Sequence, residues 1–236
     1  MDIKRKTRLF FDLDGTLTPS RQSIKPAMAD FLRKLDHTII IVSGSTNEQI
    51  RRQVGPLSYF SLGQNGNQAI DTGGRSMWDN SLDEQEKLEV WAHIEAIRPY
   101  INHAVPDEQD LIEDRGSQIS FSIYGHHAPP EAKKACDGDF KKRRALLTNH
   151  PFVSVRMEVQ IGSSTCLDYF KKGSNKGSNV RRLIEMNGWK PEDCVYFGDA
   201  LFPGGNDETV VGTIDAIPVR DEDDTLDKLL SAFSNP

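Results

Sequence analysis

Two short apolar runs joined by a segment of helical periodicity constrain the fold of this chain most. Residues 8–12 (RLFFD) and 38–45 (TIIIVSGS) are each largely apolar, and each ends in small or polar residues. Between them, residues 26–35 begin at a proline and repeat apolar side chains every three or four positions, as an amphipathic helix does. Parallel sheets bury continuous apolar strands on both faces, so the pattern predicts a βαβ unit.

The same alternation continues beyond this unit and returns near the end of the chain. A helix is expected over 47–54, and an Asn65-Gly66 turn between two apolar runs predicts a hairpin. Further on, we expect a helix over 175–186, a strand over 194–199, a helix near Asp207, a strand over 215–219 and a final helix that ends at Phe233. The predicted fold class is therefore α/β, with a doubly wound, Rossmann-like parallel-sheet core.

The middle of the chain has a different pattern. A helical segment over 82–101 precedes residues 117–124, whose alternating side chains predict an antiparallel strand with one face in solvent. A helix over 130–147 and strands over 152–161 and 164–170 follow. This mixture predicts an inserted α+β cap domain at 82–172, with residues 1–81 and 173–236 forming the core.

Composition narrows the class of protein. A net charge of −6 disfavours nucleic-acid binding, and the basic run at 141–144 lies in a helical pattern that favours a solvated face. No window approaches the roughly 18 apolar residues of a membrane helix. The three cysteines form no C-x-x-C pair. We therefore expect a cytoplasmic protein with free thiols and with neither nucleic acid nor membrane as a partner.

Polar side chains follow three of the predicted strands. Asp12 and Asp14 close the first strand, Ser43 the second, and Asp199 the strand near the C-terminus. Ligands gather at the carboxyl ends of parallel strands, so these groups should share one crevice. Two carboxylates two positions apart in an extended segment project to the same side, and they repel unless a proton or cation intervenes. Asp207 adds a carboxylate, and an all-oxygen ligand set favours Mg²⁺.

Two other ligand-binding motifs, the EF-hand and the Walker loop, do not match this sequence. An EF-hand loop beginning at Asp12 would need other residues at Thr16, Leu17 and Ser23. The segment KKGSNKGS is not a Walker loop, because Gly177 rather than Ser or Thr follows Lys176. A polar turn without chemistry remains the alternative for Asp-x-Asp-Gly taken alone.

Four separated motifs together resemble the haloacid-dehalogenase superfamily of phosphatases and phosphomutases. They are DLDGT at 12–16, VSGS at 42–45, Lys176 ahead of a helix and FGDALFPGGND at 197–207. The resemblance implies that Asp12 attacks phosphorus to form an aspartyl phosphate. It also implies that Asp14 is the general acid and base, and that Thr16 helps to hold the loop.

The resemblance implies roles for the other polar residues of the core. Ser43 and Gly44 are expected to bind phosphate, and Lys176 to offset charge between the nucleophile and the phosphate. Independently of the resemblance, a phosphate dianion cannot approach these aspartates unless positive charge reverses the local field, so Arg21 is also a candidate phosphate-binding residue. The implied Mg²⁺ ligands are Asp12, Asp14 through its backbone carbonyl, Asp199, Asp207 and Asn206.

Within the superfamily, the chain resembles the eukaryotic-type phosphomannomutases over most of its length. DLDGTLTPSRQ and FGDALFPGGNDE are similar to that family's opening and closing motifs, and Gln64 stands where its Glu-Asn-Gly has glutamate. In the cap, Arg115 matches a phosphate-binding arginine and Asp168 a sugar-binding aspartate. A cap-to-cap dimer occurs in that family, so a homodimer through the cap is left open here.

Three cap positions depart from the family pattern. His126 stands where a second phosphate-binding arginine is expected, Gly116 replaces an asparagine and Cys166 replaces a serine. The alternative to a role in phosphate binding is that His126 and His127 lie in a solvated turn before Pro129, and this is the interpretation that we favour. Arginine is a permanent, fork-shaped phosphate clamp and histidine is not, so these changes weaken the case for a second phosphate site.

A mutase must hold one end of a bisphosphate in the cap, whereas a phosphatase needs only to recognise a leaving group. We therefore expect an Mg²⁺-dependent phosphatase of sugar phosphates or similar small phosphorylated metabolites. The alternative is a phosphomannomutase that interconverts mannose 6-phosphate and mannose 1-phosphate. A catalytically silent metal-binding or ligand-binding module is a third reading, which the intact Asp12, Asp14, Lys176 and Asp199 argue against.

Overall fold

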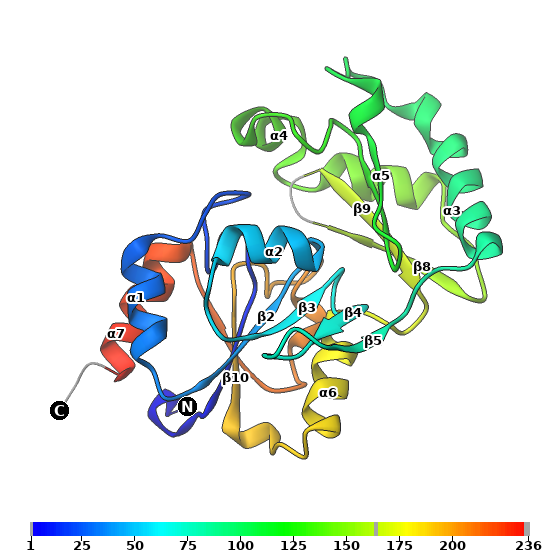
Figure 1. Cartoon of the computed structure of the whole chain (residues 1–236). Coiled ribbons are helices and arrows are strands. Elements are labelled where there is room, and N and C mark those ends of the chain that lie inside the picture. Colours follow the sequence, from blue (N-terminus) through cyan, green and yellow to red (C-terminus); the bar gives the residue numbers. More distant parts are fainter. Residues whose placement is uncertain (1, 163–164, 234–236) are drawn as a thin grey trace. The chain divides into compact units, whose positions relative to one another are not determined.

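A computed structural model describes residues 2–162 and 165–233 of the chain. The chain divides into two compact units (Figure 1). The core unit lies within residues 1–79, 175–203 and 207–236, and the inserted unit, the expected cap, comprises residues 80–174 and 204–206. The return of 204–206 to the inserted unit is not evident in the sequence pattern.

The core unit is built on a seven-stranded sheet of order β11-β10-β1-β2-β3-β4-β5. Five strands are parallel: β1 (Arg8–Phe11), β2 (Thr38–Val42), β3 (Phe60–Gly63), β10 (Cys194–Gly198) and β11 (Asp215–Pro218). Two antiparallel strands, β4 (Gln68–Ile70) and β5 (Ser76–Asp79), complete one edge. The pairing of β1 with β2 confirms the predicted βαβ unit, and the β3–β4 hairpin confirms the turn at Asn65.

Helices cover both faces of this sheet (Figure 1). Helices α1 (Pro26–Lys34), α2 (Asn47–Val54) and α7 (Glu222–Phe233) pack on one face, and α6 (Lys176–Met186) packs on the other. Strand β1 shows the alternation, because Leu9 and Phe11 belong to the first apolar cluster and Phe10 to the second. Burial on both faces explains why its sequence is continuously apolar, and the predicted doubly wound α/β class is confirmed.

The inserted unit is an α+β structure with its own apolar core. Its antiparallel sheet has the order β6-β7-β9-β8, with β6 (Ile112–Asp114), β7 (Ile119–Ser122), β8 (Met157–Ile161) and β9 (Cys166–Lys171). Its helices are α3 (Glu84–Ile97), α4 (Pro130–Asp137) and α5 (Lys141–Asn149). Short 3-10 turns in the chain are Ile3–Arg5, Arg98–Tyr100, Glu108–Asp110, Pro191–Asp193 and Glu208–Val210.

Several predicted elements are corrected. The helix expected over 130–147 is two helices, because Phe140 adopts a left-handed conformation (φ 62°) between them. The strand expected from 152 begins only at Met157, and Ser164 of the next predicted strand lies outside the described residues. The helix expected near Asp207 is a single 3-10 turn.

Strand β7 is buried on both faces, so the prediction of a solvated face is wrong. Ser120 and Ser122 are fully buried, and their hydroxyls bond to the Asp168 carboxylate at 2.6 Å and to the Thr165 hydroxyl at 2.8 Å. β7 lies between β6 and β9, and its serines satisfy their polarity inside the unit rather than in water.

Arg143 corrects the prediction of a solvated basic run. Its side chain is fully buried, while the other three basic residues of the run are exposed. The guanidinium donates to Asp137 Oδ2 at 2.6 Å and to the carbonyls of Gly162 and Cys166 at 2.7 and 2.9 Å. A buried arginine is tolerated when it is paired and hydrogen-bonded in this way, and here it ties the α4–α5 turn to the sheet.

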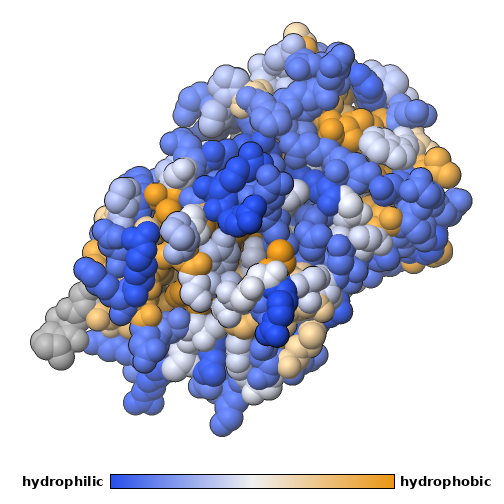
Figure 2. Space-filling view, viewed as in Figure 1, coloured by the Kyte–Doolittle hydropathy of each residue, from blue (hydrophilic) through white to orange (hydrophobic). Residues whose placement is uncertain are grey.

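Hydrophilic residues cover most of the face shown in Figure 2. Large apolar side chains are exposed at Leu88, Tyr100, Val153, Val155, Met186, Phe202, Val211 and Leu230. In the described part of the chain, every helix is too short or too polar to cross a membrane.

Candidate active site

The first predicted site residues lie in a tight loop at the carboxyl end of β1. Asp12 is buried, and its backbone N–H donates to the Phe197 carbonyl of β10 at 2.9 Å. The loop then turns on backbone bonds, including two from Leu17 and Thr18 to the Leu13 carbonyl at 2.9 Å. The Thr16 hydroxyl has no hydrogen-bond partner among the described residues, so the expected contribution of that hydroxyl to loop stability is not seen.

Two glycines let the site carboxylates pack against the strand ends. Gly15 has φ 81°, and a Cβ on it would lie 3.0 Å from Asp199 Oδ2. A Cβ on Gly198, the last residue of β10, would lie only 2.4 Å from Asp207 Oδ2. The Asp199 and Asp207 carboxylates therefore occupy space beside the loop and strand that only glycine leaves free.

Lys176 joins two of these carboxylates. The Asn175 side chain accepts from the Ser178 N–H at 3.0 Å and caps α6, so that Lys176 is the first helical residue. The lysine is fully buried, and its Nζ donates to Asp12 Oδ1 and Asp207 Oδ1, both at 2.7 Å. Burial alone would lower the pKa of Lys176, but the charges of Asp12 and Asp207 outweigh it and raise the pKa.

Asp12, Asp199 and Asp207 form a candidate metal centre. One oxygen of each carboxylate lies within 4.8 Å of the others. Burial raises the pKa of Asp12, and the charges of Asp207 and Asp199 add to this while Lys176 opposes it. Desolvation, with the charge of Asp207, raises the pKa of Asp199 to about 6, although its side chain still reaches solvent. Three oxygen donors with one ammonium leave excess negative charge, so the residues fit a divalent cation.

Tyr196 is a member of this cluster that sequence reasoning missed. Its hydroxyl donates to Asp207 Oδ1 at 2.7 Å from inside β10. Burial raises the pKa of Tyr196, and the charge of Asp207 raises it further, which keeps the phenol a proton donor. The only sequence signal was a tyrosine in an otherwise apolar strand that ends at the site.

The Asp14 carboxylate is held by Arg21 and by Gln53, and Gln53, like Tyr196, was missed by sequence reasoning. Asp14 Oδ1 accepts from the backbone N–H of Arg21 at 2.5 Å and from Gln53 Nε2 of α2 at 3.1 Å. Arg21 has a left-handed backbone (φ 55°) that turns its N–H toward Asp14. The role predicted for the Arg21 guanidinium in phosphate binding stays a prediction. Asp14 is not one of the three clustered carboxylates.

Ser43 and Gly44 follow β2, the strand beside β1. Ser43 is buried, its Oγ accepts from the Ser45 N–H at 3.0 Å and its carbonyl accepts from the Asn65 N–H at 2.7 Å. These bonds fix the loop at the same edge of the sheet as Asp12. Phosphate binding by Ser43 and Gly44 stays a prediction.

Asn206 differs from its neighbour Asp207 in its surroundings. Residues 204–206 pack with the inserted unit, whereas Asp207 packs with the core unit. The place of Asn206 among the metal ligands therefore stays a prediction.

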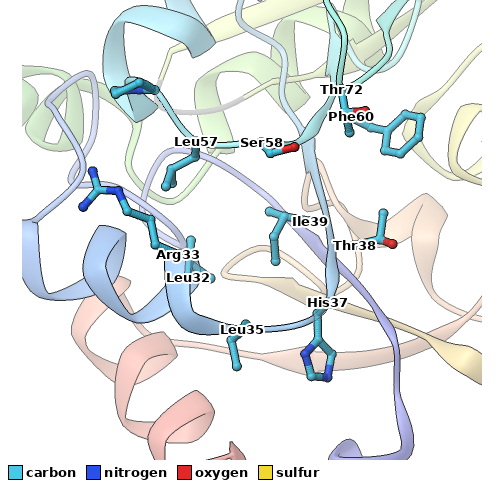
Figure 3. Close-up of a pocket in the computed structure, with 11 residues that line it drawn as sticks. Leu32, Arg33, Leu35, His37, Thr38, Ile39, Leu57, Ser58, Phe60 and Thr72 are labelled. Carbon is cyan, nitrogen blue, oxygen red and sulfur yellow. The ribbon is translucent and has the colours of Figure 1, made fainter.

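A surface pocket in the core unit lies at the other end of the sheet (Figure 3). It has a volume of about 450 Å³, and its lining includes Thr38 and Phe60, the first residues of β2 and β3. Burial lowers the pKa of His37 in this lining. Ligands of parallel sheets gather at the carboxyl ends of strands, so we do not assign the chemistry to this pocket.

The inserted unit brings its two predicted site residues into one polar cluster. Arg115 is directed to Glu113, whose Oε2 accepts from the Arg115 Nε and Nη2 at 2.9 and 2.6 Å. Burial would lower the pKa of Arg115, but the negative charges of Asp168 and Glu113 outweigh it. Ser120 Oγ holds Asp168 at 2.6 Å. No pattern in the sequence indicated the contact between Arg115 and Glu113.

The prediction that both histidines occupy a solvated turn is wrong for His126. Its side chain is fully buried, with Nε2 at 3.1 Å from the Ser120 carbonyl. His127 is exposed, and its Nδ1 pairs with Asp110 at 2.5 Å. The residue that stands in place of an expected arginine is thus an interior residue.

The fold and the carboxylate cluster define a doubly wound α/β enzyme with a candidate metal centre at the carboxyl ends of its strands. Residues 7–202 match the family model of the haloacid dehalogenase-like hydrolases, and the chain belongs to that family. This confirms the resemblance inferred from the four motifs. The chain is therefore an enzyme of a superfamily of phosphatases and phosphomutases.

Curated relatives match most of the chain, and a solved structure shares its fold. The chain is 28% identical to phosphomannomutase 1 of Dictyostelium discoideum over 88% of this chain and 87% of that protein. It is 29% identical to the phosphomannomutase of Encephalitozoon cuniculi over 97% and 94%. The IMP-bound IMP-nucleotidase of Plasmodium falciparum has a similar fold, with a TM-score of 0.66, 15% identity and coverage of 98% of this chain and 68% of that chain.

Proposed function

We propose that the protein is an Mg²⁺-dependent phosphatase that hydrolyses sugar phosphates or similar small phosphorylated metabolites through an aspartyl phosphate on Asp12. The observation that carries the proposal is the cluster of Asp12, Asp199 and Asp207, in which the buried Lys176 donates to Asp12 and Asp207 at 2.7 Å each. Such a set suits a phosphate dianion only when positive charge balances the carboxylates.

In the first step, an Asp12 oxygen attacks phosphorus and the bond from phosphorus to the leaving oxygen breaks. Asp14 gives its proton to that oxygen, so the alcohol departs neutral. Gln53 and the Arg21 N–H support this assignment, because they hold the Asp14 carboxylate in one orientation.

In the second step, Asp14 takes a proton from water, the water oxygen bonds to phosphorus, and the bond from phosphorus to the Asp12 oxygen breaks to release phosphate. Asp12 is regenerated as the carboxylate, beside Lys176. Mg²⁺ held by Asp12, Asp199 and Asp207 would neutralise charge on the phosphoryl oxygens and keep Asp12 ionised. Ser43, Gly44 and Arg21 would contact those oxygens, and the Asp14 carbonyl and Asn206 would complete the ligand set.

The polar cluster of the inserted unit favours hydrolysis over the mutase reaction. Arg115 is already paired with Glu113, and Asp168 adds a second negative charge nearby. A distal phosphate dianion would meet these carboxylates with a single arginine, whereas a neutral hydroxylated group could bond to both signs of charge. Arg115 and Asp168 are thus proposed to recognise the sugar rather than a second phosphate.

The alternative is a phosphomannomutase, which the 28% and 29% identical relatives favour by name. In that reaction a sugar hydroxyl takes the place of water in the second step. We also propose a cytoplasmic location, on three cysteines that are all free. A homodimer through the inserted unit stays a prediction.

Phosphorus NMR of mannose 1-phosphate incubated with the protein, Mg²⁺ and a catalytic amount of a sugar bisphosphate separates the two reactions. Free phosphate as the product supports the phosphatase. Conversion to the 6-phosphate would overturn it in favour of the mutase.

A further inference from the structure

Cys166 and His126 form a thiol–imidazole pair inside the inserted unit. Cys166 Sγ lies 3.7 Å from His126 Nδ1, within hydrogen-bond distance for sulfur. Cys166 opens β9, and the fully buried His126 follows the end of β7. Neither residue takes part in the chemistry proposed above.

A backbone carbonyl orients the imidazole toward the thiol. His126 Nε2 lies 3.1 Å from the Ser120 carbonyl, which can only accept a hydrogen bond. Nε2 therefore carries a proton, and Nδ1 is the nitrogen that exchanges a proton with Cys166. A thiol, an imidazole and a group that orients the imidazole are the parts of an activated cysteine nucleophile.

The charged groups around the pair favour a thiolate beside an imidazolium. Glu113 Oε1 lies 3.7 Å from His126 Nδ1, and Arg115 and Asp168 also act on the pair electrostatically. Two buried cations contact the backbone of the pair, because Arg143 donates to the Cys166 carbonyl at 2.9 Å and Lys133 Nζ to the His126 carbonyl at 2.6 Å. Burial would lower the pKa of His126, but Cys166 and then Glu113 outweigh it and raise the pKa. Burial would raise the pKa of Cys166, but His126 outweighs it and lowers the pKa, with Arg115 assisting and Asp168 opposing.

We propose that Cys166 is a redox modification site, a thiolate paired with the His126 imidazolium that reacts with hydrogen peroxide. The thiolate sulfur attacks one peroxide oxygen, the S–O bond forms and the O–O bond breaks. The departing hydroxide takes the Nδ1 proton of His126, which gives water, a neutral imidazole and a sulfenic acid on Cys166. Sulfur is oxidised by two electrons and peroxide is reduced.

Other uses of the pair fit less well. The carboxylates of the core unit are the one group of three or more metal-binding side chains found among the described residues, so the Cys166 pair is not a metal centre. Arg115 beside it would also repel a cation. Cys166 is 9% exposed, which restricts access to small reagents such as peroxide.

Cys136 provides an internal comparison. It is more exposed than Cys166, and it also lies near an imidazole, with its Sγ 3.5 Å from His103 Nε2. Nε2 of His103 is shared with the Ile123 carbonyl at 2.9 Å, however, and burial raises the pKa of Cys136. We therefore expect Cys166 to react with peroxide faster than Cys136, although Cys136 is more exposed.

Oxidation of Cys166 would alter the surface that carries Asp168. The two residues are two positions apart on β9 and project to the same face. Loss of sugar recognition on oxidation is the consequence, and this consequence alone rests on the proposed function.

The test is to treat the intact protein with hydrogen peroxide at about pH 6.5, remove the peroxide, unfold the protein in dimedone to trap sulfenic acid and quantify each cysteine by mass spectrometry. Cys166 should be labelled before Cys136, at a rate that rises less steeply with pH between about pH 6 and 8 than the rate of an ordinary thiol. A free thiol would instead speed up nearly tenfold per pH unit over that range. Labelling of Cys136 first, or a free-thiol pH profile for Cys166, would overturn the proposal.

His126→Asn tests the partner, with the exposed neighbour His127→Asn as the matched control. At about pH 6.5, His126→Asn should slow the labelling of Cys166 at least about tenfold. A free thiol of pKa ~8.5 is only about 1% ionised there, and this loss of thiolate is offset only in part, because a lower-pKa thiolate is a weaker nucleophile. His127→Asn should leave the rate unchanged. Equal rates in the two variants would contradict the pairing. The pH profile of the unmodified chain decides the matter even if His126→Asn does not fold.

Discussion

Replacing Lys176 with methionine should destabilise the core unit strongly in the absence of metal. The ammonium is fully buried and bonds to Asp12 and Asp207 at 2.7 Å each. Methionine keeps much of the side-chain length, so the packing beside β10 changes little. The variant therefore isolates the loss of the cation from three clustered carboxylates.

The magnitude follows from leaving buried carboxylates without this cation. Removing one partner of a buried ion pair costs about 3–5 kcal/mol in unfolding free energy. The loss should be greatest at neutral and alkaline pH and shrink as the pH falls. The pKa of Asp12 is already raised in the folded protein, and without Lys176 the carboxyl retains its proton to a still higher pH, which relieves repulsion.

Urea unfolding followed by circular dichroism, in EDTA and in Mg²⁺, measures this effect. Lys141→Met is the matched control, because its partner Asp139 is exposed and no measurable change is expected there. Mg²⁺ should restore more stability to Lys176→Met than it adds to the unmodified protein. Equal stabilities of the two variants in EDTA at neutral pH would refute the account of Lys176.

Three further outcomes are expected. The pKa of Asp199 is raised to about 6, so protons compete with Mg²⁺ below that pH; the calorimetric affinity should rise by at least about tenfold per pH unit up to about pH 6, and less steeply in Asp199→Asn, where the raised pKa of Asp12 still lets protons compete. An affinity independent of pH would contradict this. Gln53→Leu should remove part of the ~10²–10⁴-fold contribution of Asp14 to catalysis. The loss in kcat should be larger for a sugar phosphate than for an aryl phosphate, because an aryl leaving group needs no proton. Equal losses for the two substrates would argue against Asp14 as the proton donor. Glu113→Gln should release Arg115 and tighten inhibition by a sugar bisphosphate, and unchanged inhibition would count against the pairing described here.

Much of the core unit could be predicted because its strands are continuously apolar and its ligands follow them. Phe10 and Phe11 face opposite sides of the sheet, so burial on both faces leaves a clear pattern in the sequence. Asp12 and Asp199 lie together because their strands are hydrogen-bonded neighbours. Local pattern and global topology agree at these positions.

The inserted unit was less predictable because its polar residues are satisfied by partners distant in sequence. Arg143 reads as one charge in an exposed run, and only its contacts with Asp137 and two carbonyls explain its burial. Ser120 likewise reads as a solvent-facing strand residue until Asp168 is placed opposite it. The break at Phe140 has no glycine or proline at the left-handed position to announce it.

At the site itself, sequence reasoning found the carboxylates and the lysine but missed the residues that orient them. Gln53 lies on α2 and Tyr196 within β10, and each resembles an ordinary helix or strand residue. Each acts through a hydrogen bond to a site carboxylate, and that contact depends on the tertiary fold rather than on the spacing of residues in the sequence.

The most direct test of the central claim is hydrolysis of a generic aryl phosphate with Mg²⁺ by the unmodified protein and by Asp12→Asn. The substitution keeps the shape of the side chain and removes the attacking charge. We expect turnover by the unmodified protein and none above background by the variant, with circular dichroism showing that it stays folded. Unchanged turnover by Asp12→Asn would contradict the assignment of Asp12 as the nucleophile.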